Sequence, residues 1–150
     1  MGGDHGPAVT VAGVDLAAKA SQDVSFLLHG DAEKINAELA RYPAARAVSQ
    51  VRHTDRAISM DEKPAQAMRR GKGSSVWNAI ESVKAGEAAA AVSAGNTGAL
   101  MAISMLILRM AKDINRPAIV ASWPTSRGIT AVLDVGANVE SDAEQLVEFA

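Results

Sequence analysis

The 150-residue sequence contains no cysteine, and aromatic residues make up only 3% of it. The absence of cysteine excludes disulfide bonds, thiolate metal ligands and a covalent cysteine intermediate. Because aromatics are scarce, Ala, Val, Leu, Ile and Met must fill the core, and apolar residues as a class reach 48% of the chain. A chain of this length supports one core of ordinary size, so we predict a single domain over residues 1–150.

Long hydrophobic runs are also missing. No segment approaches the roughly 20 consecutive apolar residues that span a bilayer, and the first residues lack the basic and apolar pattern of a signal peptide. We therefore predict a cytoplasmic protein, with any membrane contact peripheral.

Charge is unevenly distributed, although the net charge is only -2. Residues 41–72 carry a net charge of +5 and the remaining residues carry -7. A basic block inside an acidic chain suggests an anionic ligand or partner, and the alternative is a solvated surface of no functional meaning. The basic residues of this block are Arg41, Arg46, Arg52, Arg56, Lys63, Arg69, Arg70 and Lys72.

Helical and strand patterns alternate along the chain. The sequence predicts helices over residues 8–20, 31–42, 64–85 and 96–111, and a helix that begins after Ser141. It predicts strands over residues 24–30, 47–51, 88–92, 118–122 and 129–135. Asp31 is the expected N-cap of the second helix, Gly71 and Gly73 break the third, and Ser141 with Glu144 is a candidate capping box.

This alternation predicts an α/β fold, with a mostly parallel sheet and helices on both of its faces. Ligands of such folds bind beyond the carboxyl ends of the strands, in the loops that lead into helices. Three of these loops are rich in glycine and polar residues. They span residues 2–7, 93–98 and 134–138.

The second of these loops, Ser93-Ala94-Gly95-Asn96-Thr97-Gly98, is a candidate anion site. A glycine-bracketed turn that opens a helix leaves backbone N–H groups unpaired, and the helix dipole favours negative charge there. The alternative is a tight turn that Asn96 caps without any ligand. The loop matches neither the Walker A pattern nor the dinucleotide fingerprint, so neither nucleotide class is indicated.

A second candidate is "RRGKGSS" at residues 69–75, where basic side chains, glycines and hydroxyls precede a predicted helix. This arrangement suits a phosphate group, but a basic surface turn explains it as well. The three histidines have no metal-ligand spacing, and only His5 lies in one of the three loops. Asp134 ends an apolar strand, where it would orient a substrate or cap a turn.

Several stretches together resemble bacterial phosphate acyltransferase, the acyl-carrier-protein:phosphate acyltransferase of phospholipid synthesis. The resemblance runs in order over nearly the whole chain. It is carried by "MGGDHGP" at 1–7, "RRGKGSSVWNAIESVKAGEA" at 69–88, "VSAGNTGALMA" at 92–102, "RPAI" at 116–119 and "LDVGANVESDAEQLVEFA" at 133–150.

The resemblance implies transfer of a fatty acyl group from acyl carrier protein to inorganic phosphate, without a cofactor or metal and without a nucleic acid partner. It implies a fold similar to the isocitrate and isopropylmalate dehydrogenases. It also implies a homodimer that touches the membrane peripherally through the C-terminal half of the family fold. The basic block would then steer the acidic carrier protein.

The resemblance also implies roles for single residues in phosphate or oxyanion binding. Asn96, Asp4 and His5 are the catalytic candidates, although the family accepts other residues at the His5 position. The binding candidates are Lys72, Ser74, Ser75, Ser93, Gly95, Thr97, Gly98, Asp134 and Asn138. We expect Asp4, Asp134 and Asn138 to line one crevice with the loop at residues 93–98.

Two departures from the family pattern concern the ends of the chain. In the family a β-strand precedes "MGGDH", and the chain continues for about as many residues again beyond position 150. We therefore expect residues 1–150 to be an incomplete N-terminal half, with doubtful activity alone. A phosphate acetyltransferase-like enzyme and a non-catalytic fragment that binds anions or the carrier protein are the alternatives.

Overall fold

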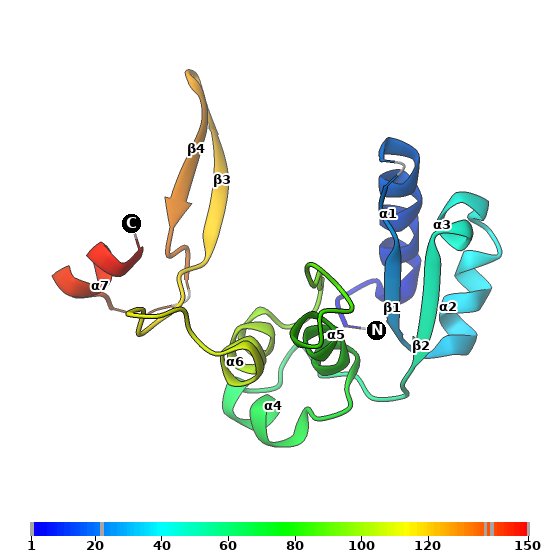
Figure 1. Ribbon diagram of the computed structural model, residues 1–150, viewed down its shortest axis with the longest axis horizontal. Coiled ribbons are helices and arrows are strands. Elements are labelled where there is room, and N and C mark those ends of the chain that lie inside the picture. The colour runs from blue at the N-terminus through cyan, green and yellow to red at the C-terminus, as the bar shows by residue number, and fades with distance from the viewer. Residues whose placement is uncertain (1, 22, 137, 139, 150) are drawn as a thin grey trace. The chain divides into compact units, whose positions relative to one another are not determined.

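The computed structural model describes residues 2–21, 23–136, 138 and 140–149. They pack as two compact units, a first unit over Met1–Ile107 and a second unit over Leu108–Ala150. Figure 1 labels the elements of both units, and each unit is described by itself.

The first unit alternates helices with strands. Its strands are β1 (Phe26–Gly30) and β2 (Ser49–His53). Its helices are α1 (Gly6–Ala20), α2 (Ala32–Leu39), α3 (Pro43–Ala47), α4 (Pro64–Arg70), α5 (Ser75–Lys84) and α6 (Thr97–Leu108).

Strands β1 and β2 pair in parallel, in a register that runs from Phe26 opposite Ser49 to Gly30 opposite His53. Because side chains alternate across a strand, Leu28 and His29 point to opposite faces. Leu28 packs with apolar residues of α1, α2 and α3, whereas His29 hydrogen-bonds to Ser82 of α5. The small parallel sheet therefore has helices on both faces, and the α/β prediction is confirmed.

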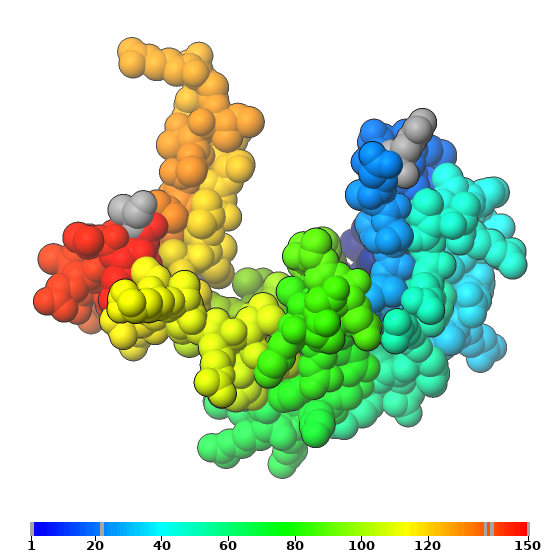
Figure 2. All heavy atoms as spheres, viewed as in Figure 1, coloured from blue at the N-terminus to red at the C-terminus, as the bar shows by residue number. Residues whose placement is uncertain are grey.

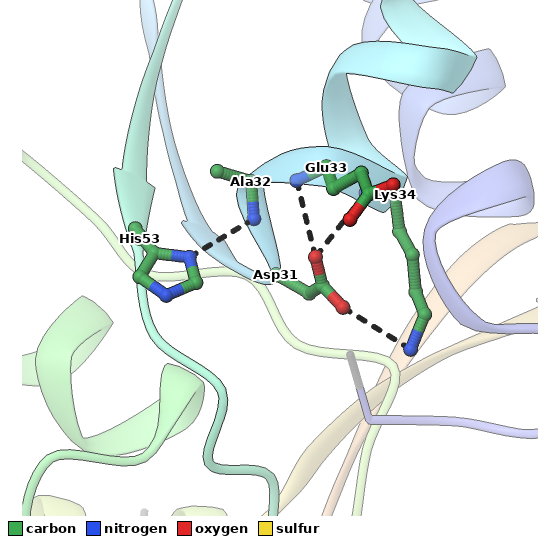
Figure 3. Close-up of polar contacts among 5 residues, drawn as sticks. All are labelled: Asp31, Ala32, Glu33, Lys34 and His53. Atoms are coloured by element: carbon green, nitrogen blue, oxygen red, sulfur yellow. Dashed lines mark hydrogen bonds and ion pairs between the residues drawn. The ribbon is translucent and has the colours of Figure 1, made fainter.

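Asp31 fixes the start of α2, as the sequence predicts. Its Oδ1 accepts hydrogen bonds from the backbone N–H groups of Glu33 and Lys34, and its Oδ2 lies 3.1 Å from the Lys34 Nζ (Figure 3). The hydrogen bond from the Lys34 backbone is the main reason why the pKa of Asp31 falls below its ordinary value. On the neighbouring strand, His53 Nδ1 accepts a hydrogen bond from the Ala32 N–H, which anchors the same turn to β2.

A second core joins α4, α5 and α6 within the first unit. Ile80 of α5 and Ile103 of α6 are almost fully buried in this core, and Ala67 of α4 is buried with them. The break between α4 and α5 lies at residues 71–74, as predicted, and Pro64 stands in the first turn of α4. This core positions the loops at residues 56–62, 71–74 and 93–98.

The second unit contains β3 (Val120–Thr125), β4 (Gly128–Leu133) and α7 (Ala143–Phe149). The two strands form an antiparallel hairpin with Val120 opposite Leu133. A capping box does begin α7, but the prediction of Ser141 with Glu144 is wrong by one residue. Asp142 accepts from the Gln145 N–H, Gln145 accepts from the Asp142 N–H, and the Ser141 hydroxyl instead donates to Asp134.

Other sequence predictions also differ from the structure. The strand predicted over residues 88–92 does not form, and Val92 is 94% exposed. A strand exists only through hydrogen bonds to a neighbour, and among the described residues none pairs with this segment. The helix predicted over residues 31–42 ends at Leu39, and Pro43 starts the short helix α3, because proline suits the first turn of a new helix.

Candidate functional site

Asn96 organises the loop at residues 93–98 through its side chain. Its Oδ1 accepts a hydrogen bond of 2.9 Å from the Ala99 N–H, so Asn96 caps α6. Its Nδ2 donates to the backbone carbonyls of Ser59, Met60 and Glu62, at 3.1, 3.0 and 2.8 Å. Both ends of the amide are thus engaged with backbone, and Asn96 joins the start of α6 to the turn at residues 59–62.

The other residues of this loop leave two backbone donors available. The Ser93 hydroxyl accepts from the Gly95 N–H at 3.2 Å, and the Asn96 carbonyl accepts from the Leu100 N–H. Within the described part of the chain, the N–H groups of Thr97 and Gly98 have no acceptor. They lie at the positive end of a 12-residue helix, and the Thr97 side chain is exposed.

The N-terminal loop packs directly against this turn. A Cβ added at Gly2 would lie 3.0 Å from the Gly95 Cα, and one added at Gly3 would lie 2.6 Å from the Ala94 carbonyl oxygen. Gly3 also has a φ of +89°, which disfavours any side chain there. Two of the three predicted loops therefore meet. Asp4 and His5 follow at once, both exposed, and His5 stands before the first turn of α1 without a side-chain cap.

Ser74 and Ser75 stand at the start of α5 in different roles. Ser74 is 2% exposed, and its hydroxyl accepts from the Trp77 N–H at 3.4 Å, so it is the N-cap. Ser75 is half-buried, and its backbone N–H donates to the Arg56 carbonyl. The Lys72 side chain is exposed.

Arg56 and Thr54 hold the 71–74 loop in place, although no sequence motif marks either residue. The Arg56 guanidinium donates to the carbonyls of Arg70 and Lys72, each at 2.6 Å. The Thr54 hydroxyl donates to the Gly73 carbonyl at 2.7 Å. In the sequence Arg56 is one cation of the basic block. A pattern of charge does not reveal that its guanidinium binds backbone carbonyls 14 and 16 residues away.

An open hollow of about 470 Å³ lies beside these loops. Its wall includes residues 56–59, 61 and 62, and Asn96 holds the turn at 59–62. Gln66 and Arg70 of α4 and the buried Ser74 also line it. Gly98 of α6 is also close to α4, since a Cβ added there would lie 2.8 Å from Pro64 Cγ. The hollow, the start of α5 and the start of α6 are therefore joined by direct contacts.

Asp134 and Asn138, in the second unit, form a polar cluster of their own. Asp134 has a φ of +55°, and its Oδ1 accepts from both the backbone N–H and the Nδ2 of Asn138. Ser141 donates to the Asp134 Oδ2, while Arg116 Nη1 donates to the Asn138 Oδ1 at 3.4 Å. The sequence placed both residues in one loop, and the structure brings them into contact. Their place in a crevice with Asp4 stays a prediction.

Groups that would hold a metal ion are not found among the described residues, where no three His, Asp or Glu side chains gather. In the same ranges, no helix is both long and apolar enough to cross a bilayer.

Comparison with known proteins gives a consistent result. A family model described as "Fatty acid synthesis protein" matches residues 1–150. A phosphate acyltransferase of Caulobacter vibrioides is 70% identical over 150 residues, which cover 100% of this chain and 42% of that protein. Proteins of the same name from Phenylobacterium zucineum and Maricaulis maris are 61% and 57% identical over the whole chain, each with 43% of its own length covered. The chain spans about two fifths of the length of these curated relatives.

Proposed function

The chain belongs to the fatty acid synthesis protein family, and from this membership we propose that it carries the phosphate-binding part of a phosphate acyltransferase. The reaction is transfer of a fatty acyl group from acyl carrier protein to inorganic phosphate, which yields an acyl phosphate for phospholipid synthesis. The names of the relatives support the acyl transfer to phosphate.

One observation carries the assignment of the site. Two glycine-rich loops, at residues 2–3 and 94–95, pack against each other beside the Thr97 and Gly98 N–H groups. Close approach of backbone to backbone, together with donors at a helix start, suits a small anion such as phosphate. In this proposal Lys72, Ser75 and Ser93 are neighbouring contacts of the bound anion.

The reaction requires few side-chain groups. A phosphate oxygen attacks the thioester carbonyl carbon, a C–O bond forms, and the C–S bond breaks as the carrier thiol leaves with the proton that phosphate gives up. The protein has to hold phosphate against the carbonyl and stabilise the negative oxygen that develops, and backbone N–H groups at a helix start can do this. Asp4 and His5 are the candidates for proton movement, because they adjoin the packed loops.

The remaining expectations belong to the whole protein. We propose a larger, mostly parallel sheet similar to that of the isocitrate and isopropylmalate dehydrogenases, a homodimer, and a cytoplasmic location with peripheral membrane contact. Asp134 and Asn138 would line the same crevice as Asp4, and no cofactor is required. The small parallel sheet with helices on both faces supports the first of these proposals.

The test is formation of acyl phosphate by a protein of full family length that carries this sequence. It is incubated with inorganic phosphate and a long-chain thioester of acyl carrier protein, and the product is trapped with hydroxylamine. We expect acyl phosphate from the long-chain carrier thioester and none from acetyl coenzyme A. Product from acetyl coenzyme A alone would instead assign the phosphate acetyltransferase reaction.

The 150-residue chain by itself is the second sample in this assay. We expect it to be inactive. If the full-length protein also forms no acyl phosphate, but phosphate or the carrier protein binds to it, the binding-module alternative replaces the enzyme.

A further inference from the structure

Helix α4 and the turn before it expose an unusual set of side chains. Lys63, Arg69, Arg70 and Lys72 are all exposed, and among the described residues none of them forms an ion pair with a carboxylate. By contrast, Arg41 and Arg52, which lie earlier in the basic block, pair with Glu38 and Glu87. Only Asp61 and Glu62 oppose the four cations within residues 60–72.

Two methionines accompany these cations. Met60 and Met68 are 47% and 38% exposed, and Ala67 is the only residue of α4 that is buried. Figure 2 shows the segment in green at the surface. Methionine is flexible and polarizable, so it suits a surface that adapts to a partner. We call the exposed side chains of Met60, Lys63, Met68, Arg69, Arg70 and Lys72 the α4 surface.

The α4 surface adjoins the candidate site. Arg70 belongs both to this surface and to the wall of the hollow, and Gln66 of the same helix lines the hollow too. The turn at residues 59–62, which precedes α4, is bonded to Asn96 at the start of α6. A partner seated on α4 would therefore stand beside the hollow and the anion loop.

From these contacts we infer that the α4 surface is the docking site of an acidic protein partner, whose thioester arm enters the adjoining hollow. Under the proposed function, on which this identification rests, the partner is the acyl carrier protein. Unpaired cations around a small apolar patch attract an acidic protein and speed its association.

An anionic membrane is the other partner that basic residues attract. Helices that lie in a bilayer interface have a continuous apolar face. Helix α4 has seven residues, and its exposed apolar side chains are Pro64, Ala65 and Met68, so it offers little to insert. The charge and size of the surface therefore favour a protein over a lipid surface.

The experiment reverses charge on α4 in a protein of full family length. The variant Lys63→Glu, at the start of α4, leaves every residue of the candidate site unchanged. Rates are measured with two thioesters of the same acyl chain, one on acyl carrier protein and one on pantetheine, which lacks the protein. We expect kcat/KM for the carrier thioester to fall at least tenfold at low ionic strength, and kcat/KM for the pantetheine thioester to stay within twofold.

The matched control is Arg127→Glu, which changes the net charge equally at an exposed position outside α4 and outside the basic block. We expect this control to keep most of the rate with the carrier thioester. Equal losses in Lys63→Glu and Arg127→Glu would overturn the docking site in favour of a general effect of net charge, and an unchanged rate in Lys63→Glu would overturn it too.

Two further measurements separate the possible failures. Calorimetric titration with acyl carrier protein, without phosphate, tests docking even if no acyl phosphate forms, in which case the proposed function fails alone. Sedimentation with vesicles of phosphatidylglycerol and phosphatidylcholine tests the membrane. Loss of vesicle binding in the α4 variant, with carrier binding intact, would overturn the inference in favour of a lipid surface.

Discussion

At the scale of single residues, Asn96 has a role that its position in a loop does not reveal. Its amide accepts one hydrogen bond from the first turn of α6 and donates to three carbonyls between residues 59 and 62. It is therefore a positioning residue in this structure, and a loss of activity on its removal would not by itself show that it contacts phosphate.

Replacing Asn96 tests this role. We expect Asn96→Ala to lower the free energy of unfolding by about 2 kcal/mol, because a helix cap is lost and three carbonyls lose their donor. Asn96→Asp keeps the cap acceptor but turns an anionic oxygen toward those carbonyls, so we expect it to be no more stable than Asn96→Ala. Urea denaturation measures both, with Thr97→Ala as the control. A fully stable Asn96→Asp variant would contradict the contacts with residues 59–62.

His29 is the residue whose protonation we expect to matter for stability. Its Nε2 lies 3.2 Å from the Ser82 Oγ, which donates to the Asn78 carbonyl and so accepts the Nε2–H of His29. Its Nδ1 is buried, with no partner among the described residues. Burial, and then the positive charge of Arg52, lower the pKa of His29 below 6.5, while Glu87 opposes this.

The lowered pKa of His29 makes the free energy of unfolding depend on pH. Because the unfolded chain takes up the His29 proton first, the free energy of unfolding should fall as the pH drops below about 6.5, until the lower pKa of the folded state is passed. His29→Gln keeps a donor toward Ser82 without titrating. We therefore expect the fall between pH 6.5 and the lower folded pKa to be smaller in this variant, as measured by urea denaturation at several pH values. An identical pH profile in both proteins would contradict this account.

At the scale of elements, the start of α5 separates a structural serine from a candidate binding serine. Ser74 is buried and caps the helix, so Ser74→Ala should cost about 1 kcal/mol of stability. Among the described residues, the Ser75 hydroxyl has no hydrogen-bond partner. We expect Ser75→Ala to leave stability nearly unchanged and to raise the KM for phosphate. If Ser75→Ala lost stability and Ser74→Ala raised the KM for phosphate instead, Ser75 would be the structural serine and Ser74 the binding serine.

Most elements of the first unit could be predicted from the sequence, because their signals are local. Asp31 marks the start of α2, Pro64 opens α4, and the glycines at 71 and 73 end it. The local pattern at residues 88–92 could not decide whether a strand forms there, because a strand depends on a neighbour distant in sequence. The capping box of α7 was misplaced by one residue because Ser141 and Asp142 are both good caps, and Ser141 is engaged with Asp134.

The loops of the candidate site could be predicted from the sequence, but the contacts between them could not. Glycine patterns located the turns at residues 2–7 and 93–98, and the structure packs one against the other. The contacts of Asn96 with residues 59–62 and of Arg56 with residues 70 and 72 join segments far apart in the chain. No spacing rule encodes such contacts, so they required the fold.

At the scale of the whole molecule, the second unit leaves its apolar side chains uncovered. None of its described residues is fully buried, and Trp123 of β3 is 61% exposed, whereas Trp77 in the first unit is 9% exposed. Monomeric proteins rarely leave so many large apolar residues exposed together, so another surface is expected to cover them.

Tryptophan fluorescence tests this expectation. In the 150-residue chain, acrylamide should quench Trp123 readily in a Trp77→Phe variant, and quench Trp77 weakly in a Trp123→Phe variant. In a protein of full family length we expect Trp123 to become protected. If Trp123 stays equally accessible at full length, the hairpin is an exposed feature of the protein.

The central claim is that the start of α6 binds phosphate, and the KM for phosphate of a Thr97→Val variant at full family length tests it most directly. Thr97 is exposed and adjoins the two available N–H groups, and Thr130→Val, exposed on β4, is the control. The account predicts at least a tenfold rise in the KM for phosphate in Thr97→Val, with no change in the unfolding midpoint and none in the control. An unchanged KM for phosphate would contradict the claim and leave the turn a structural one.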